Sequence, residues 1–562
     1  MVVGGRLVAA ASEERFSRKK GAGGWPEHAI AACLAQAGAD PADLSGVAFA
    51  GLVNPNPGLR ALRPLQRRWE LDDAGAWNPT GLRGQVAEAI QLSSPFPRMR
   101  SDGTAARLSQ PALRALLQAQ MRRALPGFTG RIQLYDHHRC HAAATWFTSG
   151  MAEGLIVVAD GVGDGLALTV WRGRGATLER LAAWPFPHSH GLLYATITAM
   201  LGFRPFRHEG KLAGLAAHGD PDAVPVPFPF EGPALDRRLP MGLGAPLRAR
   251  LAPLRGCRKE DVCAWLQRGL EQDMTGLIAG WLRQTGLRRV AAAGGVFANV
   301  RLNQLIAALD DVHQLWVFPH MGDGGLAAGS AFLLDEPRAP QVLHDVFLGP
   351  GTPSPAVTRA LQGRGLLVDQ PGDLAGAVAG HLGRGEAVAV ASGRSEFGPR
   401  ALGHRSILAS ARDPAVSDRL NDALSRSDFM PFAPALLAEA ADGSVEGLDP
   451  VRHAARFMTV CVQARDALRA SCPAVVHKDG SLRPQVVHAD TGGLLHGILQ
   501  AHHAATGEPA VLNTSFNLHE EPIVQSPEEA VRTFERSGLE ALVLGDLLVR
   551  RPGVAPAARP EG

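Results

Sequence analysis

Apolar segments that end in glycine-rich turns constrain the fold of this chain most. The segments RVAAAGG, LWVFPHMGDGG and AVAVASG, at residues 289–295, 315–325 and 387–393, each join a strand-like run to glycines. A helix is predicted over 259–284, ahead of the first of them, and another over 26–38, where Pro opens and Gly closes the segment. Strand and helix signals therefore alternate, which predicts an α/β fold.

The length of the chain predicts more than one domain. It has 562 residues, and a single hydrophobic core stops growing at about 250 to 300 residues. The segment DEPRAPQVLHDVFLGPGTPSP, residues 335–355, is dense in Pro and Gly, as expected of a connection between domains. We therefore expect one domain over residues 1–345 and a second over 346–562.

Charge, apolar patterning and cysteine usage exclude several classes of protein. The 57 basic and 54 acidic residues are interspersed, so the net charge of +3 predicts no nucleic-acid partner. No apolar run reaches the roughly 18 residues of a membrane-spanning helix, and the N-terminus becomes charged too early for a secretory signal. The six cysteines lack zinc-site spacing, and free thiols fit a reducing compartment. A cytoplasmic protein without membrane attachment is expected.

Three arginines lie close together among glycines in GRSEFGPRALGHRSIL, residues 393–408. Arginine presents five donors in a rigid fork that fits phosphate or carboxylate, and glycines let the backbone approach a ligand closely. The segment therefore predicts an anion site, which the segments GSLRPQ and LNTSFN are expected to complete. The alternative is a structural network in which arginines bond to backbone carbonyls. The predicted set is Arg394, Arg400, Arg405, Arg483, Asn513 and Ser515.

Two histidines four residues apart, His137 and His141, stand at the start of a predicted helix in DHHRCHAAATWF. This spacing projects both imidazoles from one face, as a bidentate metal site requires, although capping or surface histidines are the alternative. Asp160 ends the apolar strand LIVVAD, where a carboxylate is costly unless it is paired or binds a ligand. Asp323 follows the apolar LWVFPH in the same way. The four residues predict a catalytic divalent ion such as Fe(II), Mn(II) or Zn(II).

Glycine-rich turns in the first domain predict a nucleotide site. DGVGDG, AGGVFANV and MGDGG each follow an apolar strand, at positions where backbone amides can cradle phosphate. An ordinary strand-to-helix turn is the alternative for any one of them. Three such turns beside opposed metal-ligand candidates favour a nucleotide-binding cleft. The predicted residues are Gly163, Asp164, Gly294, Gly295, Asn299, Gly322, Gly324 and Gly325.

Together these motifs resemble the NodU/CmcH family of O-carbamoyltransferases, from Arg6 to about Arg551. The matching motifs stand in family order: EERFSRKK, DHHRCHAAATWF, VVADGVGDG, HEGKLAGLAAHGDP, GGVFANVRLN, GDGG, SEFGPRALGHRSILA, FMPFAPALL, RPQ and NTSFN. The resemblance implies an actin/Hsp70-like (ASKHA) ATP-binding domain, akin to the tRNA threonylcarbamoyl transferase, followed by a YrdC-like α/β domain. It implies that the YrdC-like domain makes carbamoyl-adenylate from carbamoyl phosphate and ATP, and that the first domain transfers the carbamoyl group to a hydroxyl beside the metal.

The resemblance also assigns roles by position. Lys20 matches a motif lysine near the transferred group. Lys20 and Arg400 are the two catalytic candidates. Arg400, Arg483 and Ser515 fall at carbamoyl phosphate contacts. The residues at the family's metal ligands are His137, His141, Asp160 and Asp323, and those at its adenosine-side turn are Gly294, Gly295 and Asn299. The implied cofactors are a divalent metal, with Fe(II) as first choice, and ATP with Mg(II) as co-substrate.

The implied partners are carbamoyl phosphate, ATP and a hydroxylated acceptor such as a natural product, a sugar or a lipo-oligosaccharide. The acceptor itself is not readable from the sequence. We expect the insertions at 54–110 and 220–254 to determine it, because loops on a rigid scaffold usually carry specificity. A homodimer is one option for the assembly.

The resemblance further implies a strand and a His-Asp turn ahead of the segment that matches GGRLVAA, and that histidine is regarded as the base for the acceptor hydroxyl. The sequence starts at Met1, after this point. A true start further upstream is favoured. The alternative is a real truncation, which would leave an unpaired strand edge and cripple the transfer step.

Three other functions are alternatives on the sequence alone. A tRNA threonylcarbamoyl-type transferase would need a basic face, which mixed charges do not predict. A metalloprotease would need the glutamate of the HExxH motif, where His138 stands. A degenerate nucleotide-binding protein without transfer activity is the third.

Overall fold

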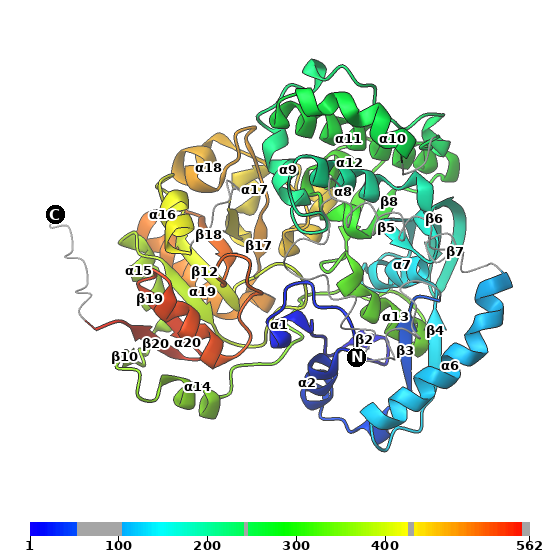
Figure 1. The fold of residues 1–562 in the computed structure, drawn as a ribbon. Helices are drawn as coiled ribbons and strands as arrows, with labels where there is room; N and C mark the ends of the chain where they lie inside the picture. Colours follow the sequence, from blue (N-terminus) through cyan, green and yellow to red (C-terminus); the bar gives the residue numbers. More distant parts are fainter. Residues whose placement is uncertain (53–103, 241–244, 425–431, 553–562) are drawn as a thin grey trace. The chain divides into compact units, whose positions relative to one another are not determined.

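The structure is a computed structural model that describes residues 1–52, 104–240, 245–424 and 432–552 (Figure 1). Most of the predicted specificity insertion at 54–110 lies outside these residues. The chain forms two compact units. The first unit comprises Met1–Val8, Gly23–Glu27 and Ala37–Leu343, and the second comprises Ala9–Ala22, His28–Gln36 and His344–Gly562.

The N-terminal segments of the second unit join it through arginine side chains. Arg15 donates from Nη2 to the carbonyl oxygen of Gly398 at 3.0 Å. Arg18 donates to the carbonyl oxygens of Pro522 and Ile523 at 2.7 and 2.8 Å. These contacts span more than 380 positions of the sequence, so a single boundary near residue 345 does not describe the course of the chain.

The first unit contains a five-stranded sheet of order β7-β6-β5-β8-β9. Its strands are β5 (Glu153–Gly163), β6 (Leu166–Arg174), β7 (Thr177–Pro185), β8 (Arg289–Ala293) and β9 (Gln314–Val317). Strand β8 runs parallel to both β5 and β9. The carboxyl ends of these three strands therefore lie at one edge of the sheet, the usual position of ligand sites in such sheets.

Helices on and around this sheet carry part of the candidate site. Those that contact its strands are α7 (His137–Phe147), α8 (His190–Met200), α11 (Lys259–Thr285) and α12 (Val300–Ala307), whereas α9 (Glu209–Ala216) packs on α11 and α13 (Leu326–Asp335) packs on α7. Helix α7 contacts β5, β8 and α13. The predicted helix over 259–284 is confirmed as α11, which ends at Gly286 in the left-handed conformation. A parallel pair of strands, β3 (Gly46–Ala50) and β4 (Arg131–Tyr135), lies beside α6 (Thr104–Ala124) and α13.

The second unit contains an eight-stranded mixed sheet of order β10-β20-β19-β11-β12-β18-β13-β17. Its strands are β10 (Leu367–Asp369), β11 (Val388–Ala391), β12 (Arg405–Ser410), β13 (Ala433–Leu437), β17 (Gln485–Val487), β18 (Ala510–Ser515), β19 (Ala541–Leu544) and β20 (Leu547–Arg550). Apolar residues of α15 (Leu374–Gly383) and α19 (Ala489–Thr506) pack with those of the sheet in one core. The predicted α/β class is thereby confirmed for both units.

Local sequence signals explain several element boundaries. Helix α2 (Glu27–Ala37) follows Pro26 and ends before Gly38, as predicted. Helix α20 (Pro527–Arg536) begins with a capping box, in which the Ser526 hydroxyl accepts from the Glu529 amide at 3.2 Å. No helix in the described ranges combines the length and apolar character needed to cross a bilayer.

Candidate active site

The four predicted metal ligands converge in the first unit. His137, His141, Asp160 and Asp323 each offer one ligand atom, and these atoms all lie within 4.8 Å of one another. His137 Nε2 lies 3.3 Å from Asp160 Oδ2 and 3.5 Å from Asp323 Oδ1. His141 Nε2 also lies 3.5 Å from Asp323 Oδ1. Tetrahedral ligands about 2.1 Å from one ion are about 3.4 Å apart, so the distances fit a divalent metal.

The surroundings of these side chains also fit a metal. His141 Nε2 is buried without a hydrogen-bond partner among the described residues, a costly state for a polar atom unless it binds something. The two histidines and Asp160 are buried, whereas the Asp323 side chain is 65% exposed. The site is therefore buried at the two histidines and Asp160 and open to solvent at Asp323. Its two imidazoles and two carboxylates suit Fe(II), Mn(II) or Zn(II).

Helix α7 is held so that its first turn faces this cluster. Asp136 caps the helix by accepting from the Arg139 amide at 2.8 Å. Asp164 was predicted to contact a nucleotide. Its carboxylate is instead fully buried and accepts the backbone N–H groups of His137 and Leu52 at 2.9 to 3.0 Å. A buried carboxylate is stable only when such donors satisfy it, and through these bonds Asp164 positions His137, a candidate metal ligand.

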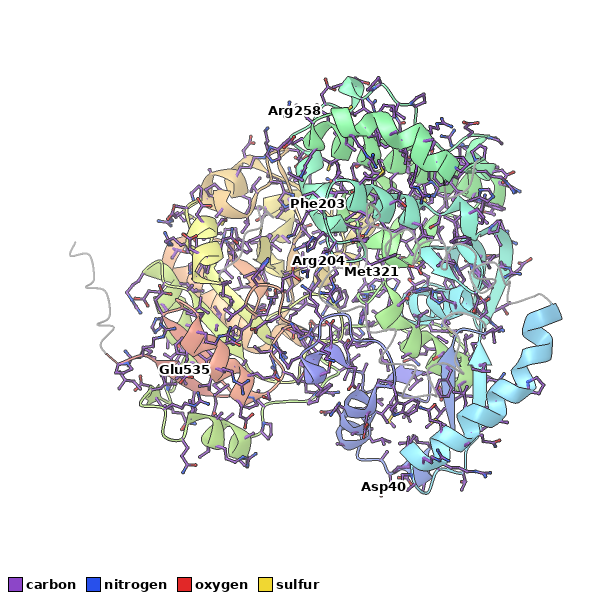
Figure 2. All side chains as sticks on the ribbon, in the orientation of Figure 1. Asp40, Phe203, Arg204, Arg258, Met321 and Glu535 are labelled. Atoms are coloured by element: carbon purple, nitrogen blue, oxygen red, sulfur yellow. The ribbon has the colours of Figure 1, made fainter. Side chains whose placement is uncertain are left out.

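The turn after β8 holds a second metal ligand. The Gly295 amide donates to Asp160 Oδ1 at 2.9 Å. Gly294 has φ of +102°, and a Cβ there would lie 2.1 Å from the carbonyl oxygen of Ala159, so only glycine fits. Its own amide donates to the carbonyl oxygen of Met321 at 2.7 Å, a residue labelled in Figure 2. The turn thus ties the ends of β5, β8 and β9 together at the site.

Asn299, predicted on the adenosine side, has a structural task. Its Oδ1 caps α12 by accepting from the Leu302 amide at 3.1 Å. Its Nδ2 donates to Gln267 Oε1 on α11 at 2.8 Å. These bonds position the turn between β8 and α12.

The other predicted glycines divide into two groups. Gly322 and Gly324 flank Asp323 and are partly or fully exposed, so their backbone is accessible to a ligand. Gly163 and Gly325 are buried. A Cβ on Gly163 would lie 2.1 Å from the His137 ring, so Gly163 makes room for a metal ligand.

The carboxylates change the protonation of the histidines. Burial lowers the pKa of His137, but the charges of Asp323 and Asp160, with the hydrogen bond to Asp160, raise it to about 9. Burial raises the pKa of Asp160, but His137 and His141 hold it well below its usual range. Burial and the charge of His137 lower the pKa of His138 to about 4. In the metal-free protein, protonated His137 therefore supplies positive charge beside the two carboxylates.

In the second unit, Arg405 and Arg394 fit the structural alternative. Arg405 is fully buried. Its guanidinium donates at 2.9 to 3.4 Å to the carbonyl oxygens of Pro350, Ser392, Gly393, His404 and Gln525. Arg394 donates to those of Leu348 and Gly349 at 2.8 and 3.2 Å. All three nitrogens of Arg405 are engaged, so this residue holds the loop 393–405 in shape and is not available to an anion.

Arg400 and Arg483 behave differently. Both are half-buried, and Nε of each is buried without a hydrogen-bond partner. The structure records neither a salt bridge nor a hydrogen bond for either guanidinium within its described ranges. The charge of Arg483, followed by burial, lowers the pKa of Arg400 to about 9. Two neighbouring guanidiniums without a counter-ion form a site that an anion would stabilise.

Asn513 was predicted to bind carbamoyl phosphate, and its amide nitrogen, the group that could donate to a phosphate oxygen, is occupied. Its Nδ2 donates to Gln485 Oε1 at 2.7 Å and to the carbonyl oxygen of Ala401 at 3.4 Å. Only Oδ1 is left, and an acceptor cannot bond to a phosphate oxygen. Ser515 is half-buried at the end of β18, opposite Ser406 of β12. Strand β18 thus brings Ser515 and Asn513 to the arginine loop.

Sequence reasoning missed three residues that hold this loop. Glu396 Oε1 accepts the backbone amides of residues 402, 404 and 405 at 2.8 to 3.1 Å. Arg15 binds the loop at Gly398, and Gln485 binds it by donating to the carbonyl oxygen of Leu402 at 2.8 Å. The signals that could have found them are polar residues at buried positions within EERF, SEFG and RPQ.

Lys20, the other predicted catalytic residue, is exposed and belongs to the second unit. It follows α1 (Glu14–Ser17), whose residues include the buried Arg15. Arg15 and Arg18 therefore anchor the segment that carries Lys20 to the unit that contains the two unpaired arginines.

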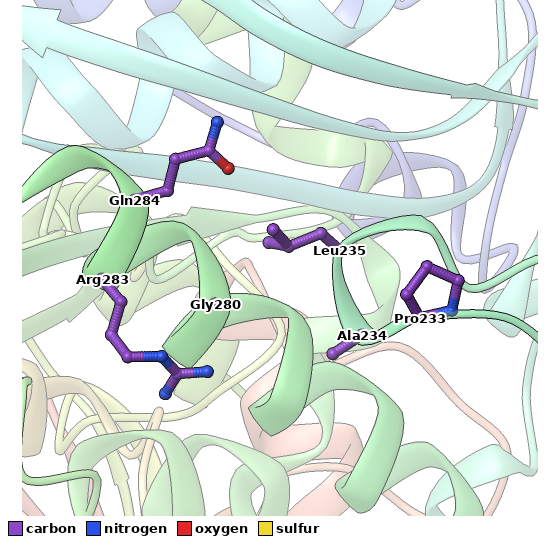
Figure 3. A pocket seen from close by; sticks show the side chains of 6 residues that line it. All are labelled: Pro233, Ala234, Leu235, Gly280, Arg283 and Gln284. Atoms are coloured by element: carbon purple, nitrogen blue, oxygen red, sulfur yellow. The ribbon is translucent and has the colours of Figure 1, made fainter.

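A separate surface hollow of about 530 Å³ lies in the first unit (Figure 3). It is lined by Pro233, Ala234, Leu235, Gly280, Arg283 and Gln284. Gly280 lies about 20 Å along α11 from Gln267, the partner of Asn299, at a rise of about 1.5 Å per residue. The hollow therefore plays no part in the site described above.

Comparison with known proteins places the chain in one family. A family model described as "Carbamoyltransferase N-terminus" matches residues 71–226 and 247–332. A second, described as "Carbamoyltransferase C-terminus", matches residues 379–551. Nodulation protein NolNO of Sinorhizobium fredii is 31% identical, with 99% of this chain and 79% of that protein aligned. Nodulation protein NolO of Bradyrhizobium diazoefficiens is 34% identical, with 74% and 79% aligned.

A crystal structure of HypF from T. kodakarensis aligns with a TM-score of 0.29 at 15% identity, over 39% of this chain and 38% of that one, and bears on neither fold nor function. The family models and the two nodulation proteins are decisive. The chain belongs to the carbamoyltransferase family and is a carbamoyltransferase.

Proposed function

We propose that the chain is an ATP-dependent O-carbamoyltransferase with two half-reactions. In the first, carbamoyl phosphate and one water give carbamate and inorganic phosphate, and a carbamate oxygen displaces pyrophosphate from ATP to form carbamoyl-adenylate. In the second, the hydroxyl of a small-molecule acceptor attacks the carbamoyl carbon, AMP leaves and the hydroxyl proton passes to a base. We assign the first half-reaction to a YrdC-like domain over 346–562 and the second to an actin/Hsp70-like domain over 1–345, whose segments 9–22 and 28–36 join the second unit.

The observation that carries this proposal is the pair of guanidiniums at Arg400 and Arg483. They lie close enough for one to lower the pKa of the other, and the buried Nε atoms of both have no hydrogen-bond partner within the ranges that the structure describes. A dianionic phosphate would satisfy both charges with bidentate hydrogen bonds. Glu396, Gln485 and Arg405 hold the loop, so the donors are oriented before the ligand arrives, which lowers the cost of binding.

The second half-reaction is supported by the cluster of four metal ligands. A bound divalent ion would polarise the carbamoyl carbonyl and stabilise the charge that develops on it. The residues of this chain supply the geometry: α7 presents His137 and His141 from one face, and the Gly295 amide orients Asp160. The exposed backbone around Asp323 leaves one side accessible to nucleotide and acceptor. Fe(II) is the ion we propose first.

The test follows the first half-reaction without an acceptor. The purified chain is incubated with ATP, Mg(II), Fe(II) and carbamoyl phosphate, and pyrophosphate and carbamoyl-adenylate are followed. We expect pyrophosphate release that requires carbamoyl phosphate and falls at least 100-fold in Arg400→Ala. Arg419→Ala is the matched control, because that arginine is about half exposed and pairs with Asp413 on the surface.

Each outcome is informative. Loss of release in Arg400→Ala with retention in Arg419→Ala supports the proposal. A folded chain that releases no pyrophosphate, or releases it equally without carbamoyl phosphate, contradicts the activation step. Either result would favour the alternative of a degenerate nucleotide-binding protein without transfer activity.

A further inference from the structure

Asn513 presents a buried hydrogen-bond acceptor that no group in the described part of the chain uses. The residue lies on β18 and is 2% exposed. Its Nδ2 makes the two bonds described above, and its Oδ1 has no partner among the described residues. A buried acceptor left unpaired costs about 1 to 3 kcal/mol, so a native protein has reason to keep one only where a ligand or water meets it.

The orientation of the Asn513 amide follows from its neighbours. The carbonyl oxygen of Leu402 can only accept, so the nitrogen of Gln485 must face it, at 2.8 Å. Gln485 Oε1 therefore faces Asn513, whose nitrogen must donate to it, at 2.7 Å. The carbonyl oxygen of Ala401 requires the same nitrogen. A flip of either amide would set oxygen against oxygen, so the unpaired atom is an oxygen.

This oxygen belongs to the surroundings of the anion site. Ala401 directly follows Arg400, and Gln485 stands two residues after Arg483. Residue 513 pairs with Leu408 of β12 and Ala433 of β13, the strand to which β17 and Gln485 are joined. The amide of Asn513 is thus bonded between the two segments that carry the unpaired guanidiniums.

The chemistry of the two kinds of group is complementary. Guanidiniums only donate, so they recognise the phosphate and carbonyl oxygens of an acyl phosphate. The Asn513 oxygen only accepts, so it recognises an N–H group. Within carbamoyl phosphate the single donor is the amino group. Acetyl phosphate has nearly the same shape and carries a methyl group in its place, which offers no hydrogen to this oxygen.

We propose that Asn513 Oδ1 accepts a hydrogen bond from the carbamoyl amino group and thereby selects carbamoyl phosphate over other acyl phosphates. The inference rests on the proposed use of carbamoyl phosphate in this unit. A site built to hydrogen-bond one substrate group rejects an analogue that lacks it, because the buried polar atom is then left unpaired. One neutral buried bond corresponds to a preference of roughly 10- to 100-fold.

The first test needs only the natural chain. Full-length protein is titrated calorimetrically with freshly dissolved carbamoyl phosphate and, separately, with acetyl phosphate, both without ATP. We expect carbamoyl phosphate to bind at least about tenfold more tightly. Equal affinities would overturn the inference and leave the proposed function intact. A failure of carbamoyl phosphate to bind would overturn both the proposed substrate and its selection by Asn513.

The second test separates selection from a structural role. Asn513→Leu removes the acceptor, and we expect the affinity ratio of the two acyl phosphates to fall to about one. Asn513→Asp keeps an acceptor oxygen in place of Oδ1 but loses the two bonds of Nδ2 to Gln485 and Ala401. Its charge and these lost bonds weaken binding of both ligands, but the ratio should stay near that of the natural chain. A ratio that is unchanged in Asn513→Leu, or that collapses equally in both variants, contradicts the inference. The comparison on the natural chain decides the matter if a variant does not fold.

Discussion

The carboxylate of Asp164 accepts the backbone N–H of His137 at 2.9 Å, so a residue outside the cluster of four candidate metal ligands determines where one of them stands. Asp164 also holds Leu52 and is fully buried. Groups that orient metal ligands are commonly worth a factor of 10 to 100 in metal affinity.

We therefore expect Asp164→Ala to weaken Co(II) binding by about 10- to 100-fold, measured from the visible absorbance of the bound ion. Asp222→Ala serves as control, because that carboxylate is 78% exposed and forms a surface pair with Arg268. Unchanged Co(II) affinity in a folded Asp164→Ala protein would show that α7 is positioned without it.

The affinity of the site for metal should rise with pH. The pKa of His137 is raised to about 9, and a metal must displace that proton before it can bind. Co(II) affinity measured between pH 6 and 9.5 should therefore increase and level off near pH 9. A flat profile would mean that His137 is not a ligand.

The same raised pKa makes the stability of the metal-free protein fall as the pH rises, whereas the affinity for metal increases. Protonated His137 stabilises the fold fully below its unfolded pKa of about 6.5, and this contribution is lost as the pH rises through about 9. Thermal melts with and without Co(II) should thus diverge as the pH increases. Melting curves that stay parallel across this window would contradict the assignment.

Gly163→Ala should damage the metal site through packing alone. The added Cβ would lie 2.1 Å from the His137 ring, so the ring must move or the strand must bend, at a cost of about 1 to 3 kcal/mol. We expect a lower melting temperature and at least tenfold weaker Co(II) binding. Gly214→Ala, within α9 and with no atom within 4 Å of the new Cβ, should be neutral or slightly stabilising. Equal behaviour of the two variants would refute this.

Glu396→Gln should destabilise the second unit. Burial raises the pKa of Glu396, but the charges of His404, Arg15 and Arg405 hold it below its usual range. The carboxylate therefore stabilises the fold above its unfolded pKa of about 4.5, and this contribution is lost as the pH falls below its folded value. We expect a loss of about 1.5 to 3 kcal/mol at pH 7 by urea unfolding, since three backbone amides lose a charged acceptor. Asp418→Asn serves as control, because Asp418 is exposed. It should change the free energy of unfolding by only about a few tenths of a kcal/mol.

Local signals in the sequence were sufficient for much of the fold and for the metal site. The strand at residues 153–163, the helix at 259–285 and the capping box at Ser526 depend on periodicity, caps and turns between near neighbours. The four candidate metal ligands each carry a local signal: His137 and His141 have helical spacing, and each aspartate follows an apolar segment, although β5 continues to Gly163 and Asp323 lies in a 3-10 turn beyond β9. Such features are encoded within a few residues.

Tertiary structure decided which polar residues face a ligand and which hold the scaffold. Arg400 and Arg405 stand five residues apart in the same glycine-rich segment, yet one is unpaired and the other donates to five carbonyl groups. Partners distant in sequence occupy the carboxylate of Asp164, which was predicted to contact a nucleotide, and the amide nitrogen of Asn513, so that only the oxygen of Asn513 is left for a ligand.

The physical reason is that a hydrogen-bonding group has a fixed number of donors and acceptors. Which of them remain available depends on segments that meet only when the chain folds. Residue types and their spacing therefore indicate which side chains could perform the chemistry and roughly where they stand along the chain. Folding satisfies some of these groups with internal hydrogen bonds and leaves others without a partner, and this selects the groups that are available to a ligand.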